Sequence, residues 1–271
     1  MKAATVDTHP TAVVHPGARL ADGVQIGPYA VIGENVALGR DTVVGAHGIV
    51  DGFTTIGEGN RIFPFASIGL EPQDLKFKGE ESTLEIGNGN VFREFVTIHR
   101  GTALGGARTV IGNSNLFMAY THIAHDCIIG SYTIFANAAT LAGHVRVEDH
   151  ATIGAYSGVH QFCRVGTYAF IGGYTVVSKD VLPFSRTVGN RARLYGINTI
   201  GFERRNMSLE RIGAIRQAFR VLQQSRLNVS QAVACLEKTE KESPNQDIRI
   251  LVEFIRSSKR GVVIKRGPER G

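Results

Sequence analysis

Histidine is the residue type whose number and position point most directly to chemistry in this chain. Five of the nine histidines, namely His99, His122, His125, His144 and His160, lie between residues 99 and 160 together with His150. Neutral imidazole has an ordinary pKa near 6.5, so it can take a proton from a hydroxyl group at neutral pH. It is also a common zinc ligand, and three such ligands suffice for a catalytic metal centre. A third interpretation is that the histidines stack for packing and hydrogen bonding.

The elements that would position these side chains repeat with a period of six residues. Aliphatic or Phe residues recur at this spacing in three blocks, and we call these 25 residues anchors. The anchors are Val14, Leu20, Ile26, Ile32, Leu38, Val44, Val50, Ile56, Ile62, Ile68, Ile86, Phe92, Ile98, Ile111, Phe117, Ile123, Ile129, Phe135, Leu141, Val147, Ile153, Val159, Val165, Ile171 and Val177. An α-helix cannot use this period, because one apolar residue in every six drifts around the helix.

A period of six is that of a short strand followed by a turn. Three such units close a triangular coil of about 18 residues whose anchors point inward, and stacked coils pair as parallel strands about 4.8 Å apart. Gly follows six of the first ten anchors, and we expect it to supply the backbone freedom of the corners. The sequence therefore predicts a mainly β solenoid that needs neither helices nor disulfides for its core.

The 18-residue coil brings the five histidines into one region. Ile123, Leu141 and Val159 are 18 residues apart and stack on one wall, with Ile98 beneath them if residues 99–110 bulge out of a single coil. Each of the five histidines is within three residues of one of these anchors. Scattered surface histidines are not expected to do this, and a general base, a metal site and a packed column all remain open.

Two interruptions and a change of pattern divide the chain. Residues 70–85 and 99–110 break the repeat and are predicted to project as loops, which often carry function on rigid scaffolds. After about residue 190 the apolar spacing becomes helical. We therefore expect a solenoid domain over residues 1–189 and a small α-helical domain over residues 190–271.

Three helices are predicted in the C-terminal domain. Ser208 is a plausible N-cap of the first helix, and Ser243 and Pro244 are typical of the N-cap and first turn of the third. Their apolar faces contain Ile212, Ile215, Phe219 and Leu222, then Val229, Val233 and Leu236, then Ile248, Leu251, Phe254 and Ile255.

Charge and composition limit the classes of function. Residues 1–185 carry 12 Lys+Arg and 16 Asp+Glu, a net charge of −4, whereas residues 186–271 carry 18 and 8, a net charge of +10. The basic end indicates an anionic ligand or partner, or else a solvated helical surface. No apolar run reaches the roughly 18 residues of a membrane-spanning helix, and no nucleic-acid motif is present. Three widely spaced cysteines favour a reducing, cytoplasmic location.

The repeat resembles the hexapeptide-repeat family, whose members form left-handed parallel β-helices, and the left hand is implied by this resemblance alone. Within that family, residues 66–69, 73–76, 96–102 and 159–163 resemble the acyl-(acyl-carrier-protein)–UDP-N-acetylglucosamine O-acyltransferases of lipid A synthesis. The most specific strings are His-Ile-Ala-His-Asp-Cys at 122–127 and Leu-Ala-Gly-His at 141–144. The resemblance extends to the C-terminal region through Gly189, Asn190, Gly196, Asn198, Arg204 and Arg205.

The resemblance implies a mechanism. A 3-hydroxyacyl group would move from a carrier-protein thioester to the glucosamine 3-hydroxyl, with His125 as general base and Asp126 as the residue that orients it. The backbone N–H of Gly143, one coil further on, would donate to the oxyanion. Adjacent strand residues point to opposite faces, so residues 125 and 126 must lie at a corner of the coil.

The resemblance also implies the binding residues. Polar groups of the sugar or acyl chain would contact Gln73, Asp74, Lys76, His99, His122, His144 and His160. The uridine diphosphate would contact Gln161, Asn198, Arg204 and Arg205, since paired arginines suit phosphate by charge and geometry.

A groove for the acyl chain is predicted on another wall. Asn137, Ala155 and Gly173 each lie two residues beyond an anchor and 18 apart, and their small side chains leave space. The family associates the position of Gly173 with acyl-chain length, which implies a relatively long chain here. The sequence departs from well-studied relatives at Ala155, at Arg191 beside this groove and at Ile200, where Gly, His and an acidic residue are common.

Partners and alternatives follow from the same comparison. The implied partners are acyl carrier protein, which delivers the acyl group on its phosphopantetheine, UDP-N-acetylglucosamine, and two further copies in a homotrimer with sites between subunits. No cofactor or metal is implied, although γ-class carbonic anhydrases build a histidine metal site on this type of repeat. Some relatives use a 3-amino sugar instead. A scaffold or ice-binding solenoid is disfavoured, because such proteins show regular ladders rather than clustered histidines.

Overall fold

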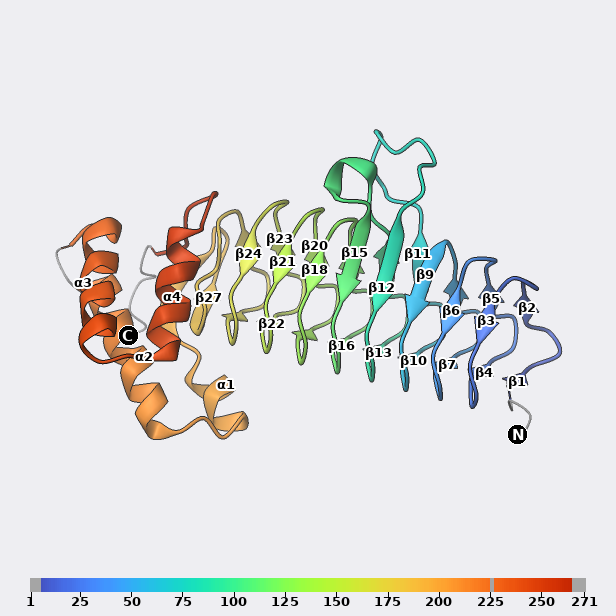
Figure 1. The fold of residues 1–271 in the computed structure, drawn as a ribbon, viewed down its shortest axis with the longest axis horizontal. Coiled ribbons are helices and arrows are strands. Elements are labelled where there is room, and N and C mark those ends of the chain that lie inside the picture. The colour runs from blue at the N-terminus through green and yellow to red at the C-terminus, as the bar shows by residue number, and fades with distance from the viewer. Residues whose placement is uncertain (1–5, 225–226, 265–271) are drawn as a thin grey trace.

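The computed structural model describes residues 6–224 and 227–264 and contains a three-sided solenoid followed by helices (Figure 1). Its parallel strands form three sheets, which we call sheets A, B and C. The predicted left-handed parallel β-helix with a helical C-terminal region is confirmed.

Each of the first eight coils adds one strand to every sheet, and a hairpin of the last two strands extends sheet A at the C-terminal end. Sheet A contains β1 (Asp7–Thr8), β4 (Gln25–Ile26), β7 (Val43–Val44), β10 (Arg61–Ile62), β13 (Val91–Phe92), β16 (Leu116–Phe117), β19 (Ile134–Phe135), β22 (Thr152–Ile153), β25 (Phe170–Ile171), β27 (Ser185–Val188) and β28 (Arg193–Ile197). Sheet B contains β2 (Val13–Val14), β5 (Val31–Ile32), β8 (Ile49–Val50), β11 (Ser67–Leu70), β14 (Thr97–His99), β17 (His122–Ile123), β20 (Thr140–Leu141), β23 (Gly158–Val159) and β26 (Val176–Val177). Sheet C contains β3 (Arg19–Leu20), β6 (Ala37–Leu38), β9 (Phe53–Ile56), β12 (Thr83–Ile86), β15 (Arg108–Ile111), β18 (Ile128–Ile129), β21 (Arg146–Val147) and β24 (Arg164–Val165).

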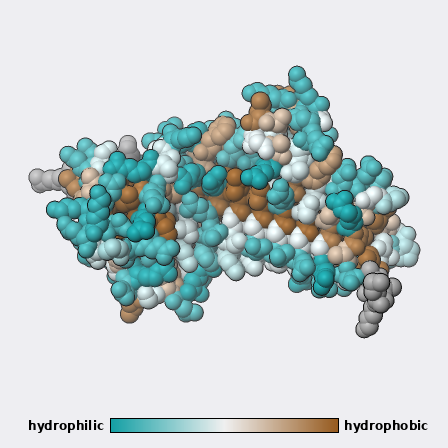
Figure 2. All heavy atoms as spheres, in the orientation of Figure 1, coloured by the Kyte–Doolittle hydropathy of each residue, from teal (hydrophilic) through white to brown (hydrophobic). Residues whose placement is uncertain are grey.

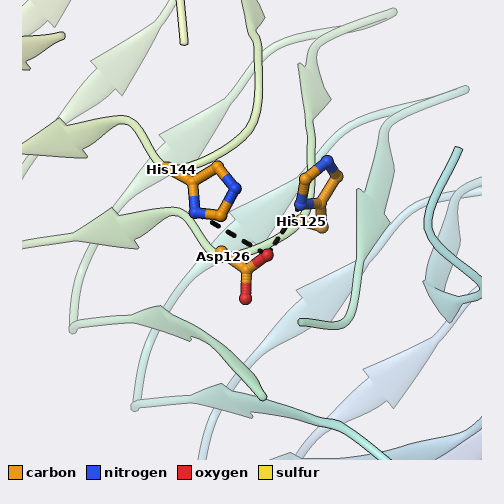
Figure 3. A group of neighbouring side chains, drawn as sticks. All are labelled: His125, Asp126 and His144. Atoms are coloured by element: carbon orange, nitrogen blue, oxygen red, sulfur yellow. Dashed lines mark hydrogen bonds and ion pairs between the residues drawn. The ribbon is translucent and has the colours of Figure 1, made fainter. Parts of the chain in front are cut away.

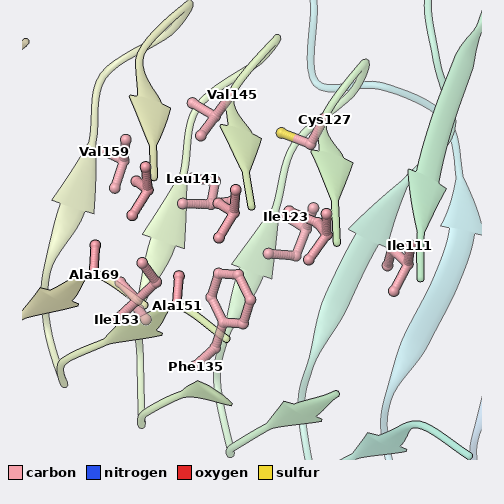
Figure 4. Close-up of a cluster of buried hydrophobic side chains, with 14 of the residues drawn as sticks. Ile111, Ile123, Cys127, Phe135, Leu141, Val145, Ala151, Ile153, Val159 and Ala169 are labelled. Carbon is pink, nitrogen blue, oxygen red and sulfur yellow. The ribbon is translucent and has the colours of Figure 1, made fainter. Parts of the chain in front are cut away.

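The register confirms the 18-residue coil. Ile123 pairs with Leu141, which pairs with Val159, and Ile98 lies beneath Ile123 as expected. Of the 25 anchors, all but Val14 and Leu20 at the N-terminal end are buried. Figure 4 shows such anchors pointing into the solenoid, where each buried side chain contributes about 1.5–3 kcal/mol.

The glycines after the anchors serve a different purpose from the one expected. Of the six, only Gly69 has a positive φ, and the left-handed corner residue instead lies three positions after most anchors, as at Asp126 (φ 59°) and His144 (φ 61°). A Cβ at Gly39 would lie 2.5 Å from the Gly57 carbonyl carbon of the next coil. Glycine is therefore needed for the close approach of successive coils, and the prediction that it supplies corner freedom was wrong.

The two loops project from one edge of the prism, where the chain passes from sheet B to sheet C (Figure 1). We call this the B–C edge, and name the C–A and A–B edges likewise. The loops are shorter than predicted: residues 83–85 pair within β12, and residues 108–110 pair within β15. Residues 71–82 and 100–107 remain outside the strands, and the second loop contains a short 3-10 helix, η1 (Ala103–Gly105). Both loops therefore project from the same edge that carries His125 and His144.

The C-terminal helices are α1 (Thr199–Arg204), α2 (Leu209–Gln224), α3 (Val229–Glu242) and α4 (Gln246–Arg256). Three of them were predicted, and α1 was missed because it is one short turn with little apolar periodicity. The Ser208 hydroxyl accepts from the Arg211 N–H (3.3 Å), as expected of an N-cap. Asn245, not Ser243, caps α4, because its side chain accepts from two backbone N–H groups of the first turn. The hairpin of β27 and β28 spans residue 189, and helical structure begins after it, at Thr199.

The surface differs between the two parts. Figure 2 shows a band of hydrophobic side chains along the solenoid and mostly hydrophilic side chains over the helices. Within the described residues, no helix combines the length and apolar character needed to cross a bilayer.

Candidate active site

The pair His125–Asp126 lies in the turn between β17 and β18, at the B–C edge. The positive φ of Asp126 turns the chain through the corner from sheet B to sheet C, so the two neighbouring side chains meet instead of pointing to opposite faces. His125 Nδ1 lies 2.7 Å from Asp126 Oδ2 (Figure 3). The corner geometry that the sequence required for this pair is therefore present.

The Asp126 carboxylate is held from several sides. The Thr102 hydroxyl donates to Oδ2 (2.7 Å), the Thr102 N–H donates to Oδ1 (3.0 Å), and the Asp126 N–H donates to the Thr109 hydroxyl (2.8 Å). Burial by itself would raise the pKa of Asp126, but hydrogen bonds from His125 and Thr102 hold that pKa below its ordinary value. The carboxylate is consequently ionised at neutral pH.

His144 lies one coil above this pair. Its Nδ1 is 3.9 Å from Asp126 Oδ2, and its ring meets the His125 ring edge-on at 5.1 Å (Figure 3). The His144 ring also stacks on Phe162, with 4.5 Å between the ring centroids. Burial lowers the pKa of His144, while the nearby carboxylates of Asp126 and Asp74 oppose that shift. The loop residue Asp74 is thus close enough to influence His144.

Gly143 faces the ring of His125. A Cβ at this position would lie 2.5 Å from Cε1 and 2.8 Å from Nε2 of His125. Among the described residues, no hydrogen-bond acceptor is found for the Gly143 N–H, although its carbonyl accepts from the Phe162 N–H (3.2 Å). A free backbone donor therefore lies beside the imidazole edge that does not face Asp126.

A second pair of histidines lies one coil below. The rings of His99 and His122 meet edge-on at 5.0 Å, and His122 Nδ1 is 2.7 Å from the Thr97 hydroxyl. Burial, together with the neighbouring positive charge that His122 and His125 would carry, lowers the pKa of His99 to about 4. Burial also lowers the pKa of His122. Both rings are therefore neutral at pH 7 and can serve as polar hydrogen-bonding groups.

The remaining predicted residues of this edge are more exposed. Gln73 and Lys76 are exposed on the 71–82 loop, where the Lys76 N–H donates to Asp74 Oδ1 (3.0 Å). His160 and Gln161 are exposed after β23, and His160 Nδ1 lies 3.1 Å from the Gln161 carbonyl oxygen. They lie at the same edge, one coil beyond His144.

Three of the four predicted nucleotide residues lie away from this edge, the exception being Gln161. Asn198, Arg204 and Arg205 line a pocket of about 640 Å³ between α1 and the outer face of sheet A, together with Arg186 and Ile200. The Asn198 side chain is already engaged, since it caps α1 and donates to the Tyr168 carbonyl (2.9 Å). The Arg205 guanidinium donates to the Tyr132 carbonyl (2.8 Å) at the C–A edge. None of the residues that line this pocket belongs to the group of His99, His122, His125 and His144.

The predicted acyl-chain residues lie at the third edge. A Cβ on Gly173 would be 3.2 Å from the Ala155 carbonyl oxygen, as expected of residues stacked in one column with Asn137. Arg191 is exposed in the β27–β28 turn, and the neighbouring Ala192 N–H donates to the Val176 carbonyl (3.0 Å). This contact places Arg191 just beyond the column.

One group of side chains has the spacing of a metal site. Ligand atoms of His125, Asp126 and His144 all lie within 4.8 Å of one another. The same atoms form the hydrogen-bonded pair described above, and an ionised carboxylate obliges His125 Nδ1 to carry its proton. The geometry thus suits a polarised imidazole with Nε2 free to accept a proton.

Sequence reasoning missed Thr102, Thr109, Phe162 and Arg186. Thr102 and Phe162 lie within the segments that carry the resemblance, so their position was the available signal. Thr109 and Arg186 carried none, because the contacts that distinguish them arise only when the loop and the hairpin fold back on the solenoid.

Comparisons with known proteins cover nearly the whole chain. The family described as UDP N-acetylglucosamine O-acyltransferase, domain 2, matches residues 180–263, and the bacterial transferase hexapeptide family (six repeats) matches residues 108–143. The acyl-(acyl-carrier-protein)–UDP-N-acetylglucosamine O-acyltransferase of Myxococcus xanthus is 48% identical over 254 residues, and that of Trichlorobacter lovleyi is 51% identical over 258. Each alignment covers 94% of this chain and 98% of the relative.

Solved structures agree with this comparison. The UDP-N-acetylglucosamine acyltransferase of Francisella novicida superimposes with a TM-score of 0.92 at 41% identity, covering 97% of this chain and 95% of that one. The O-acyltransferase of Moraxella catarrhalis gives 0.90 at 43% identity, covering 94% and 99%. Since the similarity includes the solenoid, its loops and the helical region alike, this chain belongs to the acyl-(acyl-carrier-protein)–UDP-N-acetylglucosamine O-acyltransferase family.

Proposed function

We propose that this protein transfers a 3-hydroxyacyl group from acyl carrier protein to the glucosamine 3-hydroxyl of UDP-N-acetylglucosamine, the first step of lipid A synthesis. The observation that carries the proposal is the His125–Asp126 pair, which leaves His125 Nε2 beside the backbone of Gly143, whose N–H has no acceptor among the described residues. A base and an oxyanion donor next to each other are what acyl transfer to a hydroxyl requires.

The chemical step uses His125 twice. Its Nε2 takes the proton of the sugar hydroxyl while the oxygen attacks the thioester carbonyl carbon. When the intermediate collapses, the C–S bond breaks and the protonated Nε2 returns the proton to the departing phosphopantetheine sulfur. A base of this kind contributes about 10²- to 10⁴-fold. Asp126 keeps the proton of neutral His125 on Nδ1 and stabilises the imidazolium that forms.

The Gly143 N–H would stabilise the developing oxyanion, which is worth about 10²- to 10³-fold. Neutral His99, His122 and His144 would bind hydroxyl and amide groups of the substrates, because a neutral imidazole both donates and accepts. From the same edge, the acceptor would also contact His160 and the loop residues Gln73, Asp74 and Lys76. No metal or other cofactor takes part in this scheme.

The uridine diphosphate would occupy the arginine pocket. Arg186, Arg204 and Arg205 line it without any carboxylate among its lining residues, so the pocket carries net positive charge. Asn198 shapes one wall, and Gln161 of the histidine edge would reach the nucleotide from the other side. Ile200 replaces the acidic residue common in relatives, which increases the positive character of the pocket further.

This reaction requires the histidines of the B–C edge and the arginine pocket to lie next to each other. Within one chain they lie on different sides of the solenoid. The proposal therefore includes a homotrimer in which the A–B edges lie at the threefold axis. In that arrangement sheet B of one copy faces sheet A of the next, so the B–C edge with His125 lies opposite the neighbour's pocket. Closed rings of this type are a common symmetry solution.

Surface chemistry supports this choice of edge. The left-handed corner positions of the A–B edge form a ladder of aromatic side chains that are 43–71% exposed, comprising Tyr29, Phe65, Phe95, Tyr120, Tyr156 and Tyr174. The outward side chains of sheets A and B include Leu116, Ile134, Phe170, Val13, Val31, Ile49 and Val176, whereas those of sheet C include the charged Arg19, Glu85, Arg146 and Arg164 beside Val110 and Ile128. An exposed apolar surface of this extent marks an interface, and sheet C is suited to face water.

The acyl chain would extend from His125 between two subunits toward the A–B edge. The small column of Asn137, Ala155 and Gly173 offers room there, with Arg191 at its far end, so we expect a relatively long 3-hydroxyacyl chain.

Acyl carrier protein would dock on the basic C-terminal region. Arg249 and Arg256 are paired with Glu240 and Glu237, whereas Arg216 and Arg220 lie one turn apart on α2, exposed and without an ion-pair partner among the described residues. Unpaired surface cations attract an acidic partner and steer its approach. A cytoplasmic location suits this partner and the unpaired cysteines.

The activity is tested by mixing the protein with 3-hydroxyacyl carrier proteins of several chain lengths and either UDP-N-acetylglucosamine or its 3-amino analogue. The expected result is thiol release and an O-acylated product by mass spectrometry, both lost in His125→Ala. Absence of the acylated product with the wild type would refute the proposal.

The shared site is tested by subunit complementation. His125→Ala and Arg204→Ala are each expected to be nearly inactive, whereas co-expressed subunits regain a substantial share of activity because some interfaces combine an intact His125 with an intact Arg204. No recovery in verified mixed trimers would contradict a site between subunits.

A further inference from the structure

The 100–107 loop contacts the carboxylate that orients the base, and nothing in the reaction scheme above explains why. The loop lengthens one coil by seven residues, since Val91 pairs with Leu116 at a spacing of 25 instead of 18. It turns back on the solenoid so that Thr102, which is 4% exposed, lies against Asp126.

Thr102 has an unusual use of its hydroxyl. It occupies the N-cap position of η1, where a threonine hydroxyl ordinarily accepts a hydrogen bond from its own helical turn. Here no such bond is made, and the hydroxyl donates to Asp126 Oδ2 at 2.7 Å while the Thr102 N–H donates to Oδ1 at 3.0 Å. Two donors from one residue on two oxygens define the plane of the carboxylate, which a single hydrogen bond cannot do.

The backbone of the same loop is fitted to this contact. The N–H groups of Gly105 and Ala107 both donate to the Thr102 carbonyl, at 3.0 and 2.9 Å, which holds the turn closed. A Cβ on Gly105 would overlap the carboxyl group of Asp126. The loop therefore approaches the carboxylate as closely as a backbone without a side chain allows.

Two imidazoles lie near the Asp126 carboxylate, so the orientation of the carboxylate decides which of them it hydrogen-bonds. His125 Nδ1 lies 2.7 Å from Oδ2, and His144 Nδ1 lies 3.9 Å from the same oxygen. A carboxylate free to turn about its side-chain bonds would divide its time between the two rings, and only the first is placed as the base.

We propose that Thr102 is a positioning residue for the general base, which holds the Asp126 carboxylate toward His125 and away from His144. This inference rests on the proposed function. Thr102 touches no substrate in the scheme, so its contribution should pass entirely through Asp126 and affect the chemical step rather than binding.

The test is a double-mutant cycle in the full-length protein, with kcat and KM measured for both substrates. Thr102→Val, which keeps the shape and removes the hydroxyl, is expected to lower kcat on the order of 10- to 100-fold with KM changed less than about 2-fold, as for loss of a hydrogen bond to a charged group. Thr102→Ser should recover most of kcat. In an Asp126→Asn background, Thr102→Val should change kcat by less than about 2-fold.

Thr42→Val is the matched control, because Thr42 is also fully buried and its hydroxyl donates to a carbonyl (2.9 Å) on a coil far from the site. Its kcat should equal that of the wild type. If Thr102→Val fails to fold, as judged by Tm, Thr102→Ala takes its place in the cycle. An equal loss of kcat in the wild-type and Asp126→Asn backgrounds, a rise in KM alone, or no rescue by serine would overturn the inference. Failure of the proposed function itself would show separately, as an inactive wild type or a fully active His125→Ala.

Discussion

Replacing Gly143 by Ala tests the base and the oxyanion donor in one step. The substitution keeps the backbone N–H, and Gly143 has no left-handed φ, so alanine meets no backbone strain. Its Cβ, however, would lie 2.5 Å from Cε1 of His125, whereas non-bonded carbon atoms approach to about 3.5–4.0 Å. The imidazole must therefore move by about 1 Å or more.

A displacement of about 1 Å of a catalytic group can cost roughly 100-fold, which corresponds to about 2.7 kcal/mol in activation free energy. We expect kcat of Gly143→Ala to fall by about that factor, with a small change in Tm, because the contacting atom belongs to a side chain that can shift. The assay is thiol release from 3-hydroxyacyl carrier protein at saturating UDP-N-acetylglucosamine, with Tm measured in parallel.

Gly158→Ala, in β23 of the next coil, provides the control. A Cβ at Gly158 would have nothing within 4 Å, so this variant should retain the kcat of the wild type. The reasoning is refuted if Gly143→Ala keeps kcat within about 2-fold of the wild type, or if Gly158→Ala loses as much.

Three further predictions concern the metal alternative, the nucleotide pocket and acid stability. Prolonged EDTA treatment should leave kcat unchanged, and a loss restored by added Zn²⁺ would identify the group of His125, Asp126 and His144 as a metal site. Arg186→Gln should raise KM for the sugar nucleotide by roughly 10-fold at unchanged kcat, and an unaltered KM would remove Arg186 from the pocket's function. The folded-state pKa of His99 is about 4, below the ordinary 6.5, so the unfolded chain binds the extra proton between these values and stability falls as pH drops through this window. Urea unfolding at fixed protein concentration should show the wild type losing about 3 kcal/mol more than His99→Gln between pH 7 and pH 4, and equal losses would contradict this account.

The sequence was informative wherever a pattern is local or repeats with the coil. The anchors every six residues predicted the three walls, because a solenoid brings residues 18 apart into register without further long-range information. The gathering of the histidines followed from the same arithmetic. The apolar faces of α2, α3 and α4 were predicted correctly, because helical spacing is also a local signal.

The errors came from choices between neighbouring signals. Ser243 and Asn245 are both good caps, and only the packing of α4 decides which one precedes its first turn. The glycines after the anchors suggested flexible corners, yet the neighbouring coil, invisible in the sequence, is what demands a missing side chain there.

The sequence by itself determined the solenoid, its period and the wall on which the histidines gather, because each of these follows from spacing along the chain. Only the tertiary structure decided that Thr102 donates hydrogen bonds to Asp126, that Gly143 faces His125, and that the arginine pocket lies on a different side of the prism from the histidines. These relations depend on how irregular segments fold back on a regular scaffold. Irregular segments have no period, so their contacts are set by the balance of burial and hydrogen bonding in the folded molecule.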